Sequence, residues 1–142
     1  MAAQVQFTNV DATGDAIYAT FNVVLSGSYI VGGDPLNFTG NGTLPATADP
    51  AFVGLLAQVM SSNLINVDVW SQGGAAISAA NQTGYTSACT KTSNVINPQT
   101  GVKLKVAALA SPSTSTEHAA GAYEAGYTGD LITGMAVFTK ML

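Results

Sequence analysis

Charge is what this sequence has least of. Charged residues make up 8% of the 142-residue chain, about a third of the roughly 25% that is typical of soluble domains. A folded chain of this mass exposes roughly 6,800 Å², which leaves about one charge per 570 Å² of surface. Free monomers rarely have so few charges. Either uncharged polar residues cover the surface, or an assembly buries much of it.

Arginine is absent, and the four basic residues are Lys91, Lys103, Lys105 and Lys140, which gives a net charge of −4. Nucleic-acid binding requires lysine and arginine to displace counterions from phosphates, and anionic membranes attract basic segments. Without arginine the chain also lacks bidentate clamps for phosphate. The composition therefore argues against nucleic acids and membranes as partners and against a dedicated nucleotide enzyme.

Cysteine and long apolar runs are scarce as well. The single cysteine, Cys89, has no internal disulfide partner, so we expect the chain to fold in a reducing cytosol. Residues 1–5 show no basic segment followed by an apolar run, so no secretory signal is expected. The apolar stretches are far shorter than the roughly 18 residues of a membrane-spanning helix.

Groups that carry out catalysis are few and scattered. His118 is the only histidine and adjoins a Ser/Thr-rich segment, which is typical of a solvated loop imidazole. One histidine and one cysteine do not supply the roughly four ligands of a zinc site. Nothing in the sequence places Glu117 and Glu124 across a cleft at glycosidase spacing. We therefore predict no catalytic, cofactor-binding or metal-binding residues, no small-molecule substrate and no enzymatic activity.

What the chain does have is alternation of apolar and polar residues. Its hydrophobic fraction of 47% excludes intrinsic disorder, and its length predicts one domain over residues 1–142. Ile17, Ala19, Phe21, Val23 and Leu25 share one face of a predicted strand, in which Phe21 and Val23 should be buried. Further strands are predicted near residues 4–10, 36–38, 64–70, 102–106 and 132–139, with weaker ones at 75–80 and 85–89.

Other segments predict turns, loops and one helix. Asp49 and Pro50 suit a helix start, and apolar residues at helical spacing follow, so a short helix is predicted over residues 50–61. Residues 94–101 and 111–117 are predicted to be loops. Short strands with frequent turns indicate an all-β fold, an antiparallel sandwich or barrel with one short helix.

Four segments together resemble a known family. They are the Tyr-x-x-Gly-Gly-Asp segment at 29–34, the strand at 64–70 with its glycine-rich turn, the strand at 101–106, and Glu117-(x)₃-Gly121-Ala122-Tyr123 followed by 127–130 and a closing strand. In this order they resemble small virion proteins of tailed bacteriophages, of the head-decoration or cement type.

The resemblance implies a jelly-roll-like β-sandwich that binds the major capsid protein on the outside of the shell, frequently as a trimer, and stabilises the shell. It implies a protein of the capsid surface that folds in the host cytoplasm and has no catalytic residues. A carbohydrate-binding or adhesion module of a phage tail or cell surface is the alternative. That alternative requires an exposed aromatic strip containing Trp70 and two tyrosines, flanked by Asn, Gln or Asp.

Overall fold

The computed structural model describes residues 3–38, 63–71, 82–92, 95–97, 101–111, 114–117, 119–123 and 131–139. Within these ranges every regular element is a β-strand. The predicted all-β class with antiparallel sheets is thereby confirmed. The helix predicted at 50–61 lies outside the described residues. No helix in the described part of the chain is long and apolar enough to cross a membrane.

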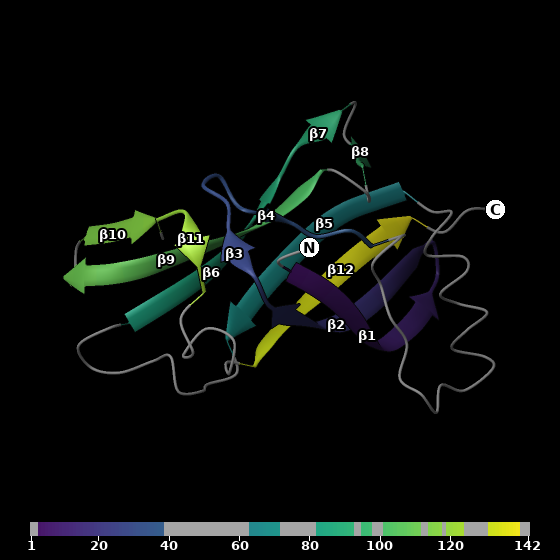
Figure 1. The fold of residues 1–142 in the computed structure, drawn as a ribbon. Coiled ribbons are helices and arrows are strands. Elements are labelled where there is room, and N and C mark those ends of the chain that lie inside the picture. The colour runs from purple at the N-terminus through teal and green to yellow at the C-terminus, as the bar shows by residue number, and fades with distance from the viewer. Residues whose placement is uncertain are drawn as a thin grey trace.

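The larger sheet has six strands in the order β1-β2-β12-β5-β8-β7 (Figure 1). Their bounds are β1 (Ala3–Thr13), β2 (Ala16–Leu25), β12 (Ile132–Thr139), β5 (Asn63–Ser71), β8 (Val95–Ile96) and β7 (Lys91–Thr92). All neighbours are antiparallel. The last strand of the chain, β12, therefore lies in the middle of the sheet, between β2 and β5.

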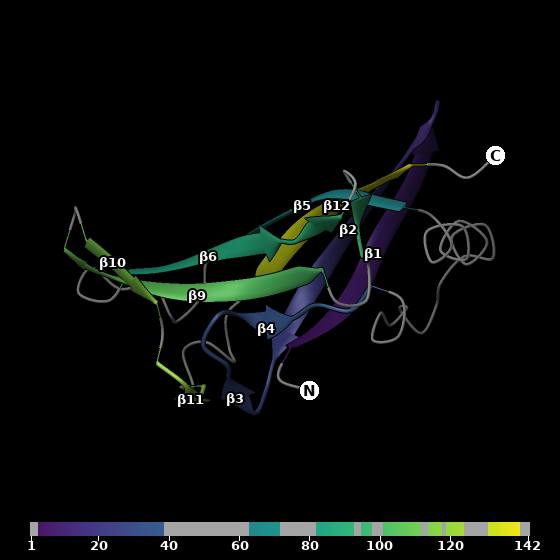
Figure 2. The same ribbon diagram turned by 90° about the horizontal axis from the view of Figure 1, so that it is seen from above.

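The second sheet is built around β9 (Val102–Ser111). Strand β6 (Gln82–Cys89) runs along one edge of β9, and β4 (Asp34–Pro35) and β10 (Thr114–Glu117) share the other edge. A small third sheet pairs β3 (Ser28–Tyr29) with β11 (Gly121–Ala122). Figure 2 shows β6 beside β9, with β3 and β11 together below β9.

A two-residue turn sets the register of the first hairpin. Thr13 pairs with Ala16, so only Gly14 and Asp15 lie between the strands. Gly14 has φ of +59°, the left-handed conformation that two-residue hairpin turns need. Strand β1 therefore extends beyond the predicted end near residue 10, since Asp11 still pairs with Tyr18.

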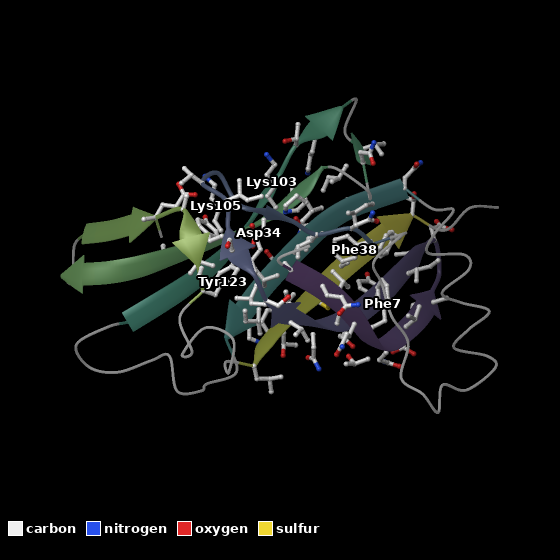
Figure 3. All side chains as sticks on the ribbon, viewed as in Figure 1. Phe7, Asp34, Phe38, Lys103, Lys105 and Tyr123 are labelled. Atoms are coloured by element: carbon white, nitrogen blue, oxygen red, sulfur yellow. The ribbon has the colours of Figure 1, made fainter. Side chains whose placement is uncertain are left out.

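The two main sheets share one apolar core. The predicted burial of Phe21 and Val23 is confirmed, at 0% and 3% exposure. The β9 residues Val102, Leu104 and Val106 belong to the same cluster of buried residues. Phe38 packs against Phe7, Phe21 and Phe138, with ring centroids 6.2, 5.1 and 6.3 Å away; Figure 3 labels Phe7 and Phe38.

Strand β12 is predicted, and its buried face consists of Ile132, Gly134, Ala136 and Phe138 rather than of Met135 and Val137. Met135 is 38% exposed and Val137 is half-buried, whereas Gly134 and Ala136 face the core. Gly134 leaves room for the ring of Phe21, because a Cβ added there would lie 2.3 Å from the Cζ of Phe21. The smallest residues of this strand are thus buried because a neighbouring aromatic ring fills the space.

Two segments pair where the sequence predicts loops. Thr114–Glu117 forms β10 and Val95–Ile96 forms β8, and β6 begins at Gln82, ahead of the weak strand predicted at 85–89. In contrast, the predicted strand at 36–38 is not one: pairing with β9 occurs at Asp34–Pro35, and the N–H of Leu36 donates to the carbonyl of Val102 at 3.0 Å. Hydrophobic alternation does not reveal β10, because a strand of Thr, Ser and Glu has no apolar face.

Candidate functional site: a carboxylate–tyrosine cluster and an outer sheet face

The candidate catalytic and binding residues of the sequence that the structure describes lie on different strands. Cys89 is half-buried at the end of β6, Glu117 ends β10, and Trp70 on β5 is 41% exposed. His118 and Glu124 lie outside the described residues. No group of three or more His, Cys, Asp or Glu side chains positioned for a metal ion occurs in the described ranges.

Two carboxylates and two tyrosines come together instead. This carboxylate–tyrosine cluster consists of Tyr29, Asp34, Glu117 and Tyr123. Asp34 is 0% exposed and is the one buried polar or charged residue found among the described residues. Its Oδ1 accepts a hydrogen bond from the N–H of Ile30 at 3.1 Å, and its Oδ2 accepts a short one from the Tyr123 hydroxyl. Figure 3 shows Asp34 and Tyr123 facing each other.

Glu117 forms the second half of the cluster. Its Oε1 accepts hydrogen bonds from the Tyr29 hydroxyl and from the N–H of Gly32, both at 2.6 Å. The rings of Tyr29 and Tyr123 meet edge to face, with centroids 5.9 Å apart. The N–H of Tyr123 also donates to the carbonyl of Gly27 at 3.1 Å. The cluster therefore ties the chain between β2 and β4 to the segment containing β10 and β11.

The cluster encloses a tight turn. The N–H of Gly33 donates to the carbonyl of Ile30 at 3.0 Å, and Gly32, the third residue of the turn, has φ of +97°. Type II turns require positive φ at this position, which favours glycine. Gly33 has φ of +112°, and a Cβ there would lie 2.9 Å from the Cβ of Lys103. The turn thus lies directly against β9, and larger residues do not fit at Gly33.

Hydrogen bonding and burial shift the acidity of two members of the cluster. The hydroxyl of Tyr29 and, next, the N–H of Gly32 lower the pKa of Glu117, with a smaller contribution from the charge of Lys105. Burial and, next, the hydrogen bond to Glu117 raise the pKa of Tyr29 to about 12. Tyr29 therefore remains a donor, and Glu117 an acceptor, throughout the neutral range.

These shifts predict a loss of stability in acid. Because the pKa of Glu117 is lowered by folding, its ionised form stabilises the fold at pH values above the ordinary carboxyl pKa of 4.5. That contribution is lost as the pH falls from 4.5 through the folded-state pKa. We expect the melting temperature of the native protein to fall more steeply below pH 4.5 than that of Glu117→Gln, which does not titrate. Equal slopes for the two proteins in thermal unfolding followed by circular dichroism would contradict the prediction.

The geometry assigns the cluster a structural role. The fully buried carboxylate of Asp34 is closed to a substrate, and one oxygen of Glu117 already accepts two hydrogen bonds. Local sequence patterns do not join the two segments, because Tyr29 and Glu117 are 88 residues apart and Asp34 and Tyr123 are 89 apart. An aspartate directly after two glycines, Gly32-Gly33-Asp34, is the sequence signal that points to such a turn.

The outer face of the six-stranded sheet is the second candidate site. Tyr18, Val24, Trp70 and Met135 are exposed there by 42, 42, 41 and 38%. Register places Trp70 level with Thr133 of β12, Met135 one row further along, and Tyr18 in the following row on β2. Trp70, Met135 and Tyr18 therefore form a diagonal across β5, β12 and β2. We call this surface the outer sheet face.

Polar residues on the outer sheet face are mostly uncharged. Asn22 and Thr133 share a row with Trp70, and Thr20 shares a row with Met135 and Asp68. Asp68 is the charged residue of these two rows, and Asp11 of β1 lies beside Tyr18 in the next row. The face is thus a weakly charged surface with large apolar side chains on it.

Comparison with known proteins leaves these two sites to be interpreted from their own geometry. No family model, curated protein or solved structure matches the chain.

Proposed function

We propose that this chain is a structural virion protein that binds the exterior of a formed capsid shell and ties neighbouring copies of the major capsid protein together. In this proposal the two main sheets form a jelly-roll-like β-sandwich, and the protein acts as a homo-oligomer, most simply a trimer. The observation that carries the proposal is the outer sheet face.

The composition of this face suits protein contact. Centres of protein interfaces are depleted of charge and enriched in aromatic residues and methionine, and Tyr18, Trp70 and Met135 fit that description. The strands beneath them pair over eight or more residues, so the side chains are held on a rigid surface. Contiguous apolar patches on soluble proteins commonly mark interaction sites.

Symmetry makes a modest contact surface sufficient. A closed shell repeats the same site many times, and a symmetric oligomer engages several of these sites at once. Once one protomer is bound, the others bind at high effective concentration, so the whole oligomer binds far more tightly than one protomer. A small domain with few charges can thereby tie shell subunits together.

The carboxylate–tyrosine cluster supports the proposal because it joins two of the segments that resemble head-decoration proteins. The Tyr-x-x-Gly-Gly-Asp segment and the Glu117-to-Tyr123 segment both resemble parts of head-decoration proteins, and their side chains meet in the carboxylate–tyrosine cluster. Residues in mutual contact form a structural unit, so these segments have a reason to occur together in one chain.

Shell binding is the direct test. Purified protein added to particles that lack it is expected to bind at a fixed stoichiometry and to raise the temperature at which the shells open. Trp70→Ala is expected to weaken binding about tenfold or more, as truncation of a central aromatic contact does, whereas Trp70→Phe should retain most of the affinity. Wild-type protein that neither binds shells nor stabilises them would contradict the proposal.

Glycan binding is the second candidate, and the diagonal of Trp70, Met135 and Tyr18 is the observation that favours it. Asn22, Asn66 and Asp68 lie in the same rows and supply polar groups for sugar hydroxyls. One tyrosine of the described residues joins Trp70 there, whereas an adhesion module calls for two. Binding to host polysaccharide without binding to shells, abolished by Trp70→Ala, would favour this function over capsid decoration.

A further inference from the structure

The two most exposed large apolar side chains among the described residues are adjacent. Ile30 is 57% exposed and Val31 is 60% exposed. They are the first two residues of the Ile30–Gly33 turn. Isolated apolar residues on a surface need no explanation, but two β-branched side chains side by side on one tight turn are a small apolar projection.

Three backbone N–H groups of the turn that carries this projection donate hydrogen bonds. The N–H of Ile30 donates to Asp34, the N–H of Gly32 donates to Glu117, and the N–H of Gly33 donates to the carbonyl of Ile30, at 3.1, 2.6 and 3.0 Å. Ile and Val side chains are themselves restricted at χ1. A surface that is already ordered loses little conformational entropy on binding, so it binds more tightly than a flexible one.

Two lysines lie beside the turn, together with the carboxylates of Asp34 and Glu117 that hold it. Lys103 is exposed and contacts the turn at Gly33, and Lys105, two residues along β9, acts on Glu117. Figure 3 labels both lysines beside Asp34. No ion pair joins Lys103 to another residue in the described ranges. A partner that covers this turn therefore meets two apolar side chains next to the exposed Lys103.

We propose that the Ile30–Gly33 turn is an anchor that inserts into an apolar pocket with an acidic rim on the shell protein. Ile30 and Val31 enter the pocket, and Lys103 pairs with a carboxylate at its rim. The proposal rests on the proposed function, since it takes the shell protein as the partner, and it adds a contact separate from the outer sheet face. It also gives the carboxylate–tyrosine cluster a purpose, which is to fix the turn in its binding conformation.

Two matched double variants test the apolar contact. Ile30→Ser with Val31→Ser removes apolar surface and keeps every backbone hydrogen bond of the turn, whereas Ile30→Val with Val31→Ile keeps the surface apolar. We expect the serine variant to bind purified shells at least tenfold more weakly than wild type and the apolar variant to bind within about twofold of it. Both should melt close to wild type, because the substituted side chains are largely exposed.

A matched pair of charge reversals tests the rim. Lys103→Glu and Lys91→Glu change the net charge equally, and Lys91 is exposed on β7 of the other main sheet. Lys103→Glu is expected to weaken shell binding at least tenfold at low salt, with a smaller effect at high salt where charges are screened. Lys91→Glu should bind like wild type.

The binding experiments distinguish failure of the proposed anchor from failure of the proposed function. If wild type binds shells and the serine variant binds equally well, the anchor is overturned and the proposed function stands. If wild type does not bind shells, both are overturned. If the serine variant loses its oligomeric mass in analytical ultracentrifugation while its protomers still bind shells as wild type does, the turn contacts a second copy of this chain, and the anchor is again overturned.

Discussion

Replacing Phe21 with alanine is expected to lower the free energy of unfolding by about 3–5 kcal/mol, the usual cost of truncating a buried aromatic residue. Phe21 is fully buried, its ring meets Phe38 edge to face at 5.1 Å, and Gly134 leaves space for it from the next strand. The loss is a large part of the total stability of a small domain. Chemical denaturation followed by fluorescence or circular dichroism measures it, and an unchanged midpoint would contradict the assigned core face of β2.

Gly134 provides a control for the same contact. A Cβ at this position would lie 2.3 Å from Phe21 Cζ but also 2.9 Å from the carbonyl oxygen of Asp68. Gly134→Ala should therefore destabilise the wild-type protein, and its cost should be smaller in the Phe21→Ala background, where the ring is gone. Additive effects in this double-mutant cycle would show that the two sites do not share the space assigned to them.

Replacing Asp34 with alanine is expected to cost about 2–6 kcal/mol, because two donors lose their acceptor in a buried site, at about 1–3 kcal/mol each. These donors are the N–H of Ile30 and the hydroxyl of Tyr123. The substitution also frees the Ile30–Gly33 turn from β4. Thermal or chemical unfolding measures the loss, and amide hydrogen exchange at Ile30 should report the freed N–H.

Asp34→Asn is the matched control, because the amide retains one carbonyl oxygen in a side chain of nearly the same shape. We expect it to cost clearly less than Asp34→Ala. An alanine variant as stable as wild type, with protection at Ile30 unchanged, would show that the carboxylate does not hold the turn. If shell binding falls in Asp34→Ala by more than the loss of folded protein explains, order in the turn contributes to binding as well as to stability.

Under the proposed function, the carboxylate–tyrosine cluster would affect both the stability of the fold and the binding of the shell. A buried carboxylate loses hydration on folding, and good hydrogen bonds must compensate for it. In this chain those hydrogen bonds fix a surface turn with two exposed apolar side chains. An arrangement of this kind is expected where a small protein must present a contact in one conformation, and the binding and stability variants described above measure the two effects separately.

The sequence by itself determined the strands whose side chains alternate cleanly. The face formed by Ile17, Phe21 and Val23 is visible without a structure because each second residue of a strand points to the same side. The same reasoning identified β5 and the first half of β9, and the all-β class followed from them. Composition also indicated the weakly charged surface that the outer sheet face displays.

Tertiary structure decided the remainder, because the information lies in contacts between distant segments. Gly134 and Ala136 carry little hydrophobic signal, and only the contact with the ring of Phe21 explains why the buried face of β12 has a glycine at position 134. The strands β8 and β10 are defined by backbone pairing with β5 and β9, which side-chain periodicity does not encode. The carboxylate–tyrosine cluster joins residues almost ninety positions apart. Hydrogen bonds of that kind depend on where the folded sheets bring two segments together. A local sequence pattern does not contain the distance in space between segments that are far apart in the chain.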